Sequence, residues 1–147
     1  MSATALRGGC HCGNLVVDLV LTQPAASYAP RCCDCSFCRK HGAAWLSDAR
    51  GSLRVVQRDA AAVLRYRQGS GQADCLACAR CAVLVLVTCE IEGRLYAAVN
   101  ARVLDGEPGF ASAQSASPQR LVPDDKRSRW QQLWFADVHI EAVDPLA

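Results

Sequence analysis

The sequence contains no long apolar run. No stretch approaches the ~20 apolar residues that a membrane-spanning helix needs. The segment from Met1 to Gly9 has no apolar core of signal-peptide length. We therefore expect no membrane association and a cytoplasmic location, where disulfide bonds are rare.

The chain also has little excess charge of either sign. Its 16 Lys and Arg residues and 14 Asp and Glu residues give a formal net charge of +2. A nucleic-acid-binding surface normally needs a more basic balance or a basic stripe, so we expect no nucleic-acid partner. The densest basic run, Lys126 to Arg129, follows two aspartates and is typical of a solvated loop.

Helical periodicity is scarce, and most of the regular pattern predicts strands. One short helix is expected from Ser36 to about His41, with Ser36 as its cap. Residues 106 to 130 predict a long surface loop that could include a short helical piece, with the least periodicity between Gly106 and Asp125. The expected strands are Leu15–Leu21, Leu53–Arg58 and Ala61–Arg67 (a pair joined by a turn at Asp59), Val83–Thr88 (central and covered on both faces), Leu95–Val99 and Leu133–Ala142.

Cysteine is the residue type that stands out, with ten in 147 residues. A disulfide framework would require an oxidising compartment. Structural core cysteines would stand singly along strands. These cysteines instead cluster at gaps of one and two residues, which is typical of metal ligands.

Two of the clusters each offer half of a tetrahedral site. Cys10 and Cys12 are one residue apart and are flanked by glycines, which permit a sharp turn. Further along, Cys75-x-x-Cys78-x-x-Cys81 contains two overlapping pairs, and either could supply the other half. We favour Cys78 and Cys81, because that pair directly precedes an expected strand, as Cys12 does.

The remaining cluster, Cys33-x-Cys35-x-x-Cys38, offers three thiolates from one short turn. Three protein ligands leave a fourth position for water or substrate, as in catalytic zinc sites. Arg39 and Lys40 follow directly and would attract an anionic ligand. Solvation of a helix end explains these two cations equally well.

Several other residues have more than one interpretation. Cys89 ends an apolar strand and predicts a core position. Cys32 and Cys75 flank the clusters and could be spare thiols, alternative ligands or redox partners. His41 follows the three-cysteine turn and could be a ligand, a neighbour of one or an acid–base group.

The order of four elements resembles the glutathione-dependent formaldehyde-activating enzyme family, also called the CENP-V/GFA domain. The resemblance is strongest over residues 8 to 106, and we expect one domain over residues 1 to 147. The matching elements are Gly9-Cys10-His11-Cys12-Gly13, Cys33-Asp34-Cys35-Ser36-Phe37-Cys38-Arg39-Lys40, Cys78-Ala79-Arg80-Cys81 and Val99-Asn100-Ala101-Arg102-Val103-Leu104-Asp105.

The resemblance implies an all-β, Mss4-like fold of several small twisted antiparallel sheets with short helical turns. It implies two zinc ions per chain. A structural zinc would be held by four cysteines, and a catalytic zinc by three. The implied ligands are Cys10, Cys12, Cys78 and Cys81 for the first ion, and Cys33, Cys35 and Cys38 for the second.

The family's founding activity is the condensation of formaldehyde with glutathione, which forms S-(hydroxymethyl)glutathione and is classed with the carbon–sulfur lyases. By this resemblance, Arg39, Lys40 and Arg102 would hold the carboxylates of a small thiol such as glutathione. The chain departs from the family pattern at Ala77, Ala82 and Arg102. Ala82 and Arg102 replace glycines, and Ala77 replaces an aromatic residue.

Two other functions are compatible with the sequence. The chain would be a non-catalytic, zinc-stabilised module that binds a protein partner if the second site is saturated by its own side chains. It would be a thiol redox or metal-handling protein if Cys75 and Cys78 act as a dithiol. A homodimer is compatible with each of these functions.

Overall fold

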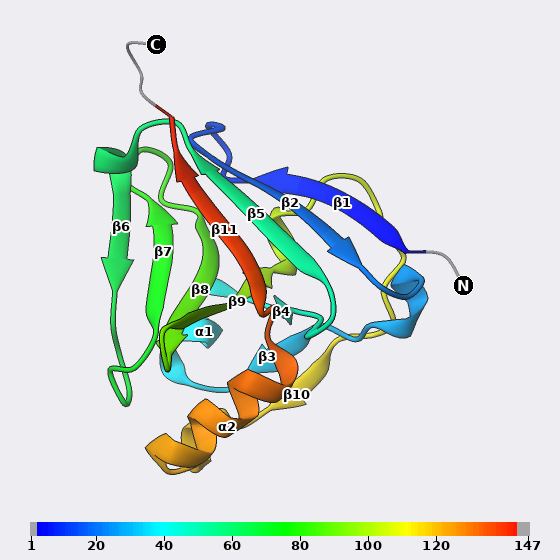
Figure 1. Cartoon of the computed structure of the whole chain (residues 1–147), viewed down its shortest axis with the longest axis vertical. Coiled ribbons are helices and arrows are strands. Elements are labelled where there is room, and N and C mark those ends of the chain that lie inside the picture. Colours follow the sequence, from blue (N-terminus) through cyan, green and yellow to red (C-terminus); the bar gives the residue numbers. More distant parts are fainter. Residues whose placement is uncertain (1–2, 144–147) are drawn as a thin grey trace.

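The computed structural model describes residues 3–143, which form two β-sheets and few helices (Figure 1). The all-β prediction is confirmed. One sheet has four strands in the order β1-β2-β5-β11, and the other has seven in the order β10-β3-β4-β9-β8-β7-β6. The strands are β1 (Thr4–Gly9), β2 (Leu15–Leu21), β3 (Arg31–Cys33), β4 (Trp45–Leu46), β5 (Ser52–Gln57), β6 (Val63–Tyr66), β7 (Asp74–Cys78), β8 (Leu84–Ile91), β9 (Arg94–Asn100), β10 (Gln114–Ala116) and β11 (Asp137–Ala142).

The four-stranded sheet buries one face. Along β2, Leu15, Val17, Leu19 and Leu21 are buried, while the residues between them are partly or fully exposed. This period of two is expected for a strand with one side against the core. These side chains pack against residues of β8 and β9, so an apolar cluster lies between the two sheets.

The prediction of a covered central strand is confirmed for β8. It pairs with β7 on one side and β9 on the other, and seven of its eight residues are buried. Val85 belongs to the cluster between the sheets, whereas Val87 belongs to a second cluster that also contains Cys35, Cys38 and Trp45. The seven-stranded sheet therefore has packed side chains on both faces.

The expected pairing of Leu53–Arg58 with Ala61–Arg67 is wrong. Strand β5 pairs with β2 and β11, whereas β6 pairs with β7 in the other sheet. Between them, Asp59 caps the 3-10 turn Ala60–Ala62. The side-chain amide of Asn14 also donates to the carbonyl oxygens of Asp59 and Ala62. These bonds redirect the chain instead of closing a hairpin.

Two strand pairs are parallel, although the resemblance implied antiparallel sheets. They are β10 with β3 and β11 with β5. Strands β10 and β11 lie in the last third of the chain, beyond residues 8 to 106. The resemblance offered no guide to their pairing.

Helix α1 (Ser36–His41) lies where the sequence predicts it, but its cap is Cys35 and not Ser36. The sulfur of Cys35 accepts a hydrogen bond from the backbone N–H of Cys38 across 3.4 Å. A capping role therefore falls on one of the expected metal ligands.

Helix α2 (Pro123–Leu133) occupies part of the expected surface loop and of the expected strand Leu133–Ala142. Pro123 begins the helix, and Asp124 and Asp125 follow in its first turn. Both features favour a helix N-terminus. Among residues 3–143, no helix has the length and apolar character needed to cross a membrane.

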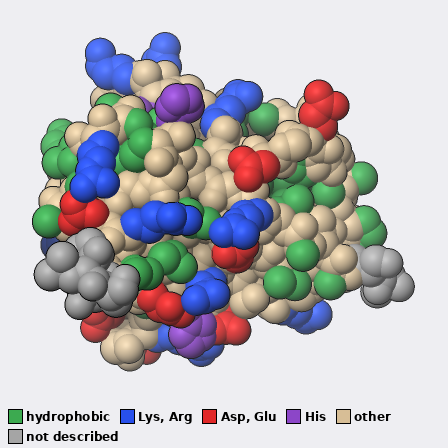
Figure 2. Space-filling model, turned by 90° about the horizontal axis from the view of Figure 1, so that it is seen from above, with side chains coloured by type: hydrophobic (Ala, Val, Ile, Leu, Met, Phe, Trp, Pro, Cys, Tyr) green, Lys and Arg blue, Asp and Glu red, His purple; other side chains and the backbone are tan. Residues whose placement is uncertain are grey.

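The surface is of mixed charge on the face seen in Figure 2, where Lys and Arg side chains lie among those of Asp and Glu. Several cations of the described chain are paired, as in Arg54 with Glu141 and Arg80 with Asp59. The absence of a nucleic-acid partner stays a prediction.

Candidate metal centres and the adjoining cavity

The first cysteine cluster joins the two sheets. Cys10 and Cys12 lie in the turn between β1 and β2, while Cys78 ends β7 and Cys81 lies in the turn before β8. Their four sulfur atoms all lie within 4.8 Å of one another, so this group could hold a metal ion. The structure thus brings Cys78 and Cys81, the pair that we favoured, to Cys10 and Cys12.

Backbone N–H groups shape both halves of this cluster. The N–H of Leu15 donates to the sulfur of Cys10 across 3.2 Å, and the N–H of Arg80 donates to that of Cys78 across 3.3 Å. Gly13 closes the first turn with a φ of 83°, which costs glycine little. Ala82 closes the second turn with a φ of 68°, a conformation unfavourable for a residue with a Cβ atom.

The surroundings of the sulfur atoms in this cluster give their thiols different pKa values. Burial raises the pKa of Cys81, but hydrogen bonds from the backbone N–H groups of Cys12 and Val83 outweigh it and lower this pKa to about 6. The N–H of Asn14 lowers the pKa of Cys12, but hydrogen bonds to the thiols of Cys78, Cys10 and Cys81 together with burial outweigh it and raise this pKa to about 11. A cluster that keeps thiolates at neutral pH favours a bound cation.

The second cluster comes from one local segment. Cys33 ends β3, Cys35 caps α1, and Cys38 lies in the first turn of α1. Their sulfur atoms also lie within 4.8 Å of one another, and this group of three could hold a metal ion. A hydrogen bond from Cys38 lowers the pKa of Cys33 to about 6, and the same bond raises the pKa of Cys38.

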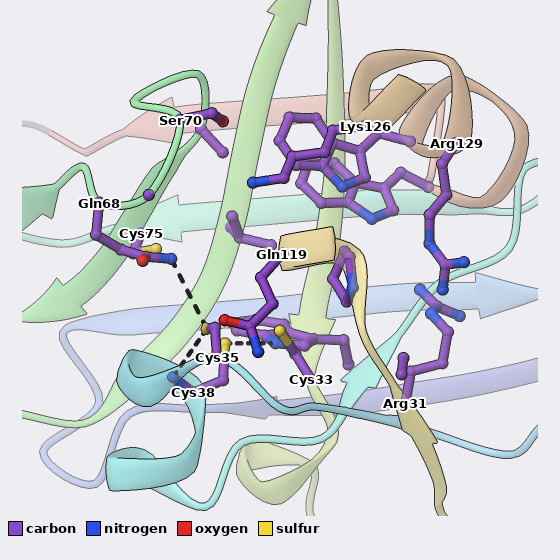
Figure 3. A pocket seen from close by; sticks show the side chains of 18 of the residues that line it. Arg31, Cys33, Cys35, Cys38, Gln68, Ser70, Cys75, Gln119, Lys126 and Arg129 are labelled. Atoms are coloured by element: carbon purple, nitrogen blue, oxygen red, sulfur yellow. Dashed lines mark hydrogen bonds between the residues drawn. The ribbon is translucent and has the colours of Figure 1, made fainter. Parts of the chain in front are cut away.

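Two side chains donate to the sulfur atoms of the second cluster (Figure 3). The indole N–H of Trp45 donates to Cys38 across 3.4 Å, and the amide of Gln68 lies 3.9 Å from the sulfur of Cys35. Donors to ligand sulfurs orient the ligands and tune their basicity.

A cavity of about 560 Å³ opens on the second cluster but not on the first. Its wall includes all three cysteines of the second cluster, three cations and three tryptophans. This volume suits a small organic ligand. The lining residues are Arg31, Cys33, Cys35, Ser36, Cys38, Trp45, Gln68, Gly69, Ser70, Ala73, Cys75, Val87, Ala116, Pro118, Gln119, Lys126, Arg129, Trp130 and Trp134.

The cations expected at the site do not line this cavity. Arg39 and Lys40 lie exposed in the last turn of α1. Arg102 donates through Nε to the carbonyl oxygen of Gly42 across 3.2 Å, at the end of that helix. The three cations that do line the cavity are Arg31, Lys126 and Arg129.

The basic run from Lys126 to Arg129 is therefore not a solvated loop. It lies on α2, where Lys126, Arg129 and Trp130 face the cavity. The spacing of three and four residues is the signal that could have shown a shared helical face. Arg31 also carried a signal, because on a strand it shares a face with Cys33.

Arg31 is held from one side by protein groups. Its Nη2 donates to the hydroxyl of Ser47 across 2.7 Å, and that hydroxyl donates to the carbonyl oxygen of Leu133. Burial, together with the nearby charge of Arg129, lowers the pKa of Arg31 to about 10. The side chain therefore remains charged at neutral pH.

Cys75 lines the cavity but does not form a dithiol with Cys78. It belongs to the apolar cluster with Cys35 and Cys38, whereas Cys78 belongs to the cluster between the sheets. Both lie on the extended strand β7, and three residues of strand span about 10 Å. A disulfide needs Cα atoms less than about 7 Å apart, so the structure argues against this redox pair.

The other surplus cysteines lie outside both clusters. Cys89 is buried in the core, as predicted, and its thiol donates to the carbonyl oxygen of Gln72 across 3.2 Å. Burial raises the pKa of Cys75 to about 11, which keeps it a neutral thiol. Cys32 is partly buried on β3.

None of the three histidines belongs to either cysteine group. His11 is exposed between two cysteines, and the exposed ring of His41 packs on Phe37 with centroids 4.7 Å apart. His139 is exposed beside Asp137. Among residues 3–143 the second cluster therefore has three cysteines and no histidine.

Comparison with known proteins yields one structural neighbour. No protein-family model and no curated protein matches the chain. A solved structure of a Rhodobacter sphaeroides protein, a structural genomics target, matches with a TM-score of 0.58 and 28% sequence identity. The match covers 75% of this chain and 99% of that one. The comparison supports the fold.

Proposed function

We propose that this chain is a zinc-dependent enzyme of the carbon–sulfur lyase type, acting on an adduct of a small thiol and an aldehyde. By its resemblance to the glutathione-dependent formaldehyde-activating family, the thiol would be glutathione and the aldehyde formaldehyde. One observation carries the proposal. The cluster with three cysteines opens on the cavity, whereas the cluster with four does not.

The donor sets fit zinc. Tetrahedral zinc with Zn–S bonds of about 2.3 Å separates its sulfur ligands by about 3.8 Å. In the first cluster the sulfur of Cys12 lies 3.7 Å from that of Cys10 and 3.5 Å from that of Cys78. Four cysteines would saturate the ion and make this site structural. Cys33, Cys35 and Cys38 would leave one position of the second ion open toward the cavity.

A zinc ion with an open position favours the deprotonated form of a thiol that binds there. The chain's own residues would then serve the addition. The cavity would hold the aldehyde beside the sulfur and so supply proximity. The new S–C bond forms as the C=O π bond of the aldehyde breaks. The proton lost by the thiol ends on the former carbonyl oxygen, which gives the S-hydroxymethyl product. The ammonium of Lys126 lines the cavity and would stabilise the developing alkoxide.

Cobalt substitution tests the proposal. We expect close to two metal ions per chain and a change in the cobalt charge-transfer bands when glutathione is added. S-methylglutathione is the matched control, because it has no free thiol and should leave those bands unchanged. An unchanged spectrum with glutathione would refute thiol binding at the metal. NMR with ¹³C-formaldehyde and glutathione then tests the reaction itself. The S-hydroxymethyl product should form faster with the protein than without it.

The strongest rival is a structural two-zinc module that binds a protein partner. It requires a fourth protein ligand at the second site. Cys75 lines the same cavity, so it is the residue to test. If the rival is correct, glutathione should leave the cobalt spectrum of the parent protein unchanged. The same addition should change the cobalt spectrum of Cys75→Ser, because that variant lacks the fourth ligand.

A further inference from the structure

We infer that the cavity recognises a carboxylate of its ligand through the facing guanidinium groups of Arg31 and Arg129. The ligand would be a small organic anion with at least one carboxylate. That it is also a thiol rests on the proposed function. In this inference Arg31 and Arg129 select an acidic ligand, in place of the groups expected from the sequence. Those groups were Arg39, Lys40 and Arg102.

The two arginines come from different elements and meet at one side of the cavity. Arg31 lies on β3 and Arg129 on α2, and in Figure 3 their guanidinium groups point toward each other. Cys33, Cys35 and Cys38 lie between this pair and Gln68 in the same view. A ligand with a carboxylate at the arginines can therefore extend along the wall toward the second cluster.

No carboxylate of the described residues neutralises this pair. Among residues 3–143, the ion pairs include neither arginine nor Lys126, and no Asp or Glu lines the cavity. Two like charges brought together without a counter-ion destabilise each other. An anionic ligand would remove that cost.

The donors of Arg31 are available on the cavity side. Its one protein hydrogen bond is the Nη2 bond to Ser47 within the described chain. A guanidinium has five N–H donors, and no side-chain nitrogen or oxygen atom of the described residues is both fully buried and unpartnered. The remaining N–H groups of Arg31 are therefore open to a ligand. A planar fork of donors matches a carboxylate in two hydrogen bonds.

The cavity wall also suits the organic part of such a ligand. Trp130 and Trp134 stack with ring centroids 4.7 Å apart, and both line the cavity with Trp45. The wall thus combines an apolar surface, three positive charges and the three cysteines. A simple inorganic anion would use only the charges.

The same helix supplies a matched control. Arg127 lies two residues before Arg129 but does not line the cavity, and it pairs with Asp124 instead. Arg127→Gln and Arg129→Gln remove the same charge from the same helix. Any difference between them reports on the cavity rather than on the net charge of the protein.

Isothermal titration of S-methylglutathione into the metal-loaded protein tests the inference without a thiol. We expect Arg129→Gln and Arg31→Gln each to weaken binding roughly ten- to a hundred-fold, as for a lost charge-assisted hydrogen bond. Arg127→Gln should change binding by less than about two-fold. The metal content and unfolding temperature of each variant show whether it has folded.

Other outcomes would overturn the inference. One is equal weakening by Arg127→Gln and Arg129→Gln, and another is tighter binding of inorganic phosphate than of S-methylglutathione. A third is a change in the cobalt spectrum with 2-mercaptoethanol, which has no carboxylate, at a concentration as low as that required for glutathione. By contrast, arginine-dependent binding of S-methylglutathione with a cobalt spectrum that no thiol changes would refute the proposed function and leave the carboxylate site standing.

Discussion

The indole N–H of Trp45 donates a hydrogen bond to the sulfur of Cys38 across 3.4 Å, inside the wall of the cavity. Trp45 is buried and begins β4, directly beside the strand and helix that carry the three cysteines. This bond lowers the pKa of Cys38 against the larger opposing effects of Cys33 and burial. It therefore stabilises the thiolate form in which this cysteine would bind a metal.

Trp45→Phe should weaken metal binding at the second cluster about ten- to a hundred-fold, the usual effect of losing a partner of a metal ligand. Competition with a chromophoric chelator measures this affinity. Trp130→Phe is the control, because Trp130 lines the same cavity but makes no hydrogen bond to sulfur among the described contacts. Equal losses in the two variants would assign the effect to packing and not to the bond.

The two clusters should differ in what they contribute to stability. The first joins the β1–β2 turn of one sheet to the β7–β8 region of the other, whereas the second lies within one short segment. Cys81→Ser should therefore lower the unfolding temperature by on the order of 10 °C or more, because its metal couples to folding of the whole chain.

Cys33→Ser is the counterpart. It should retain close to one metal ion per chain and unfold within a few degrees of the parent protein, as measured by elemental analysis and thermal unfolding. A similar large drop in the unfolding temperature of both Cys81→Ser and Cys33→Ser would mean that the second cluster also stabilises the fold.

The cysteine spacing predicts the group Cys33, Cys35 and Cys38, because ligands at gaps of one and two residues come from a single turn. It leaves open which pair among Cys75, Cys78 and Cys81 joins Cys10 and Cys12, because these two turns are far apart in the sequence. Alternation along β2 and the doubly apolar pattern of β8 likewise predicted which faces are buried. These features are local. Each depends on residues that are close together in the sequence.

The cations of the cavity could not be assigned in the same way. Arg31 and Arg129 are 98 positions apart (129 minus 31), and they meet because β3 and α2 line the same cavity in the folded chain. Adjacency to the cysteines favoured Arg39 and Lys40. However, the last turn of α1 points those side chains into solvent.

Asp48 should make the stability of the protein sensitive to acid. Its carboxylate accepts hydrogen bonds from the Thr22 N–H and hydroxyl and from the Tyr28 hydroxyl. Burial raises the pKa of Asp48, but these bonds outweigh it and lower the pKa from 3.8 to about 2. Because the folded-state pKa is depressed, this stabilisation is complete above about pH 5 and is lost as the pH falls from 4 to 2.

Asp48→Asn should cost roughly 1–2 kcal/mol at pH 7, after allowance for solvent screening. Urea unfolding of both proteins between pH 8 and pH 3 measures the difference, which should shrink below pH 4. Asp18→Asn is the control at an exposed ion pair with Arg7, where less than about 0.5 kcal/mol is expected. A pH-independent difference would contradict a contribution from charge.

Ala82 occupies a backbone conformation that a glycine would adopt more readily. Its φ is 68°, and its N–H donates to the carbonyl oxygen of Cys78 across 2.8 Å to close the turn that carries Cys81. The left-handed conformation costs a residue with a Cβ atom roughly 1–2 kcal/mol. Glycine avoids this cost, but part of the gain is lost because glycine is more flexible in the unfolded chain.

Ala82→Gly should therefore stabilise the protein by up to about 1 kcal/mol, or raise its unfolding temperature by about 2–4 °C. Ala79→Gly in the same turn is the control. Ala79 has no positive φ, so glycine there adds only flexibility and should be neutral or destabilising. Differential scanning calorimetry of the metal-loaded proteins measures both. Stabilisation by neither variant would show that the bonds around Cys78 already offset the strain at Ala82.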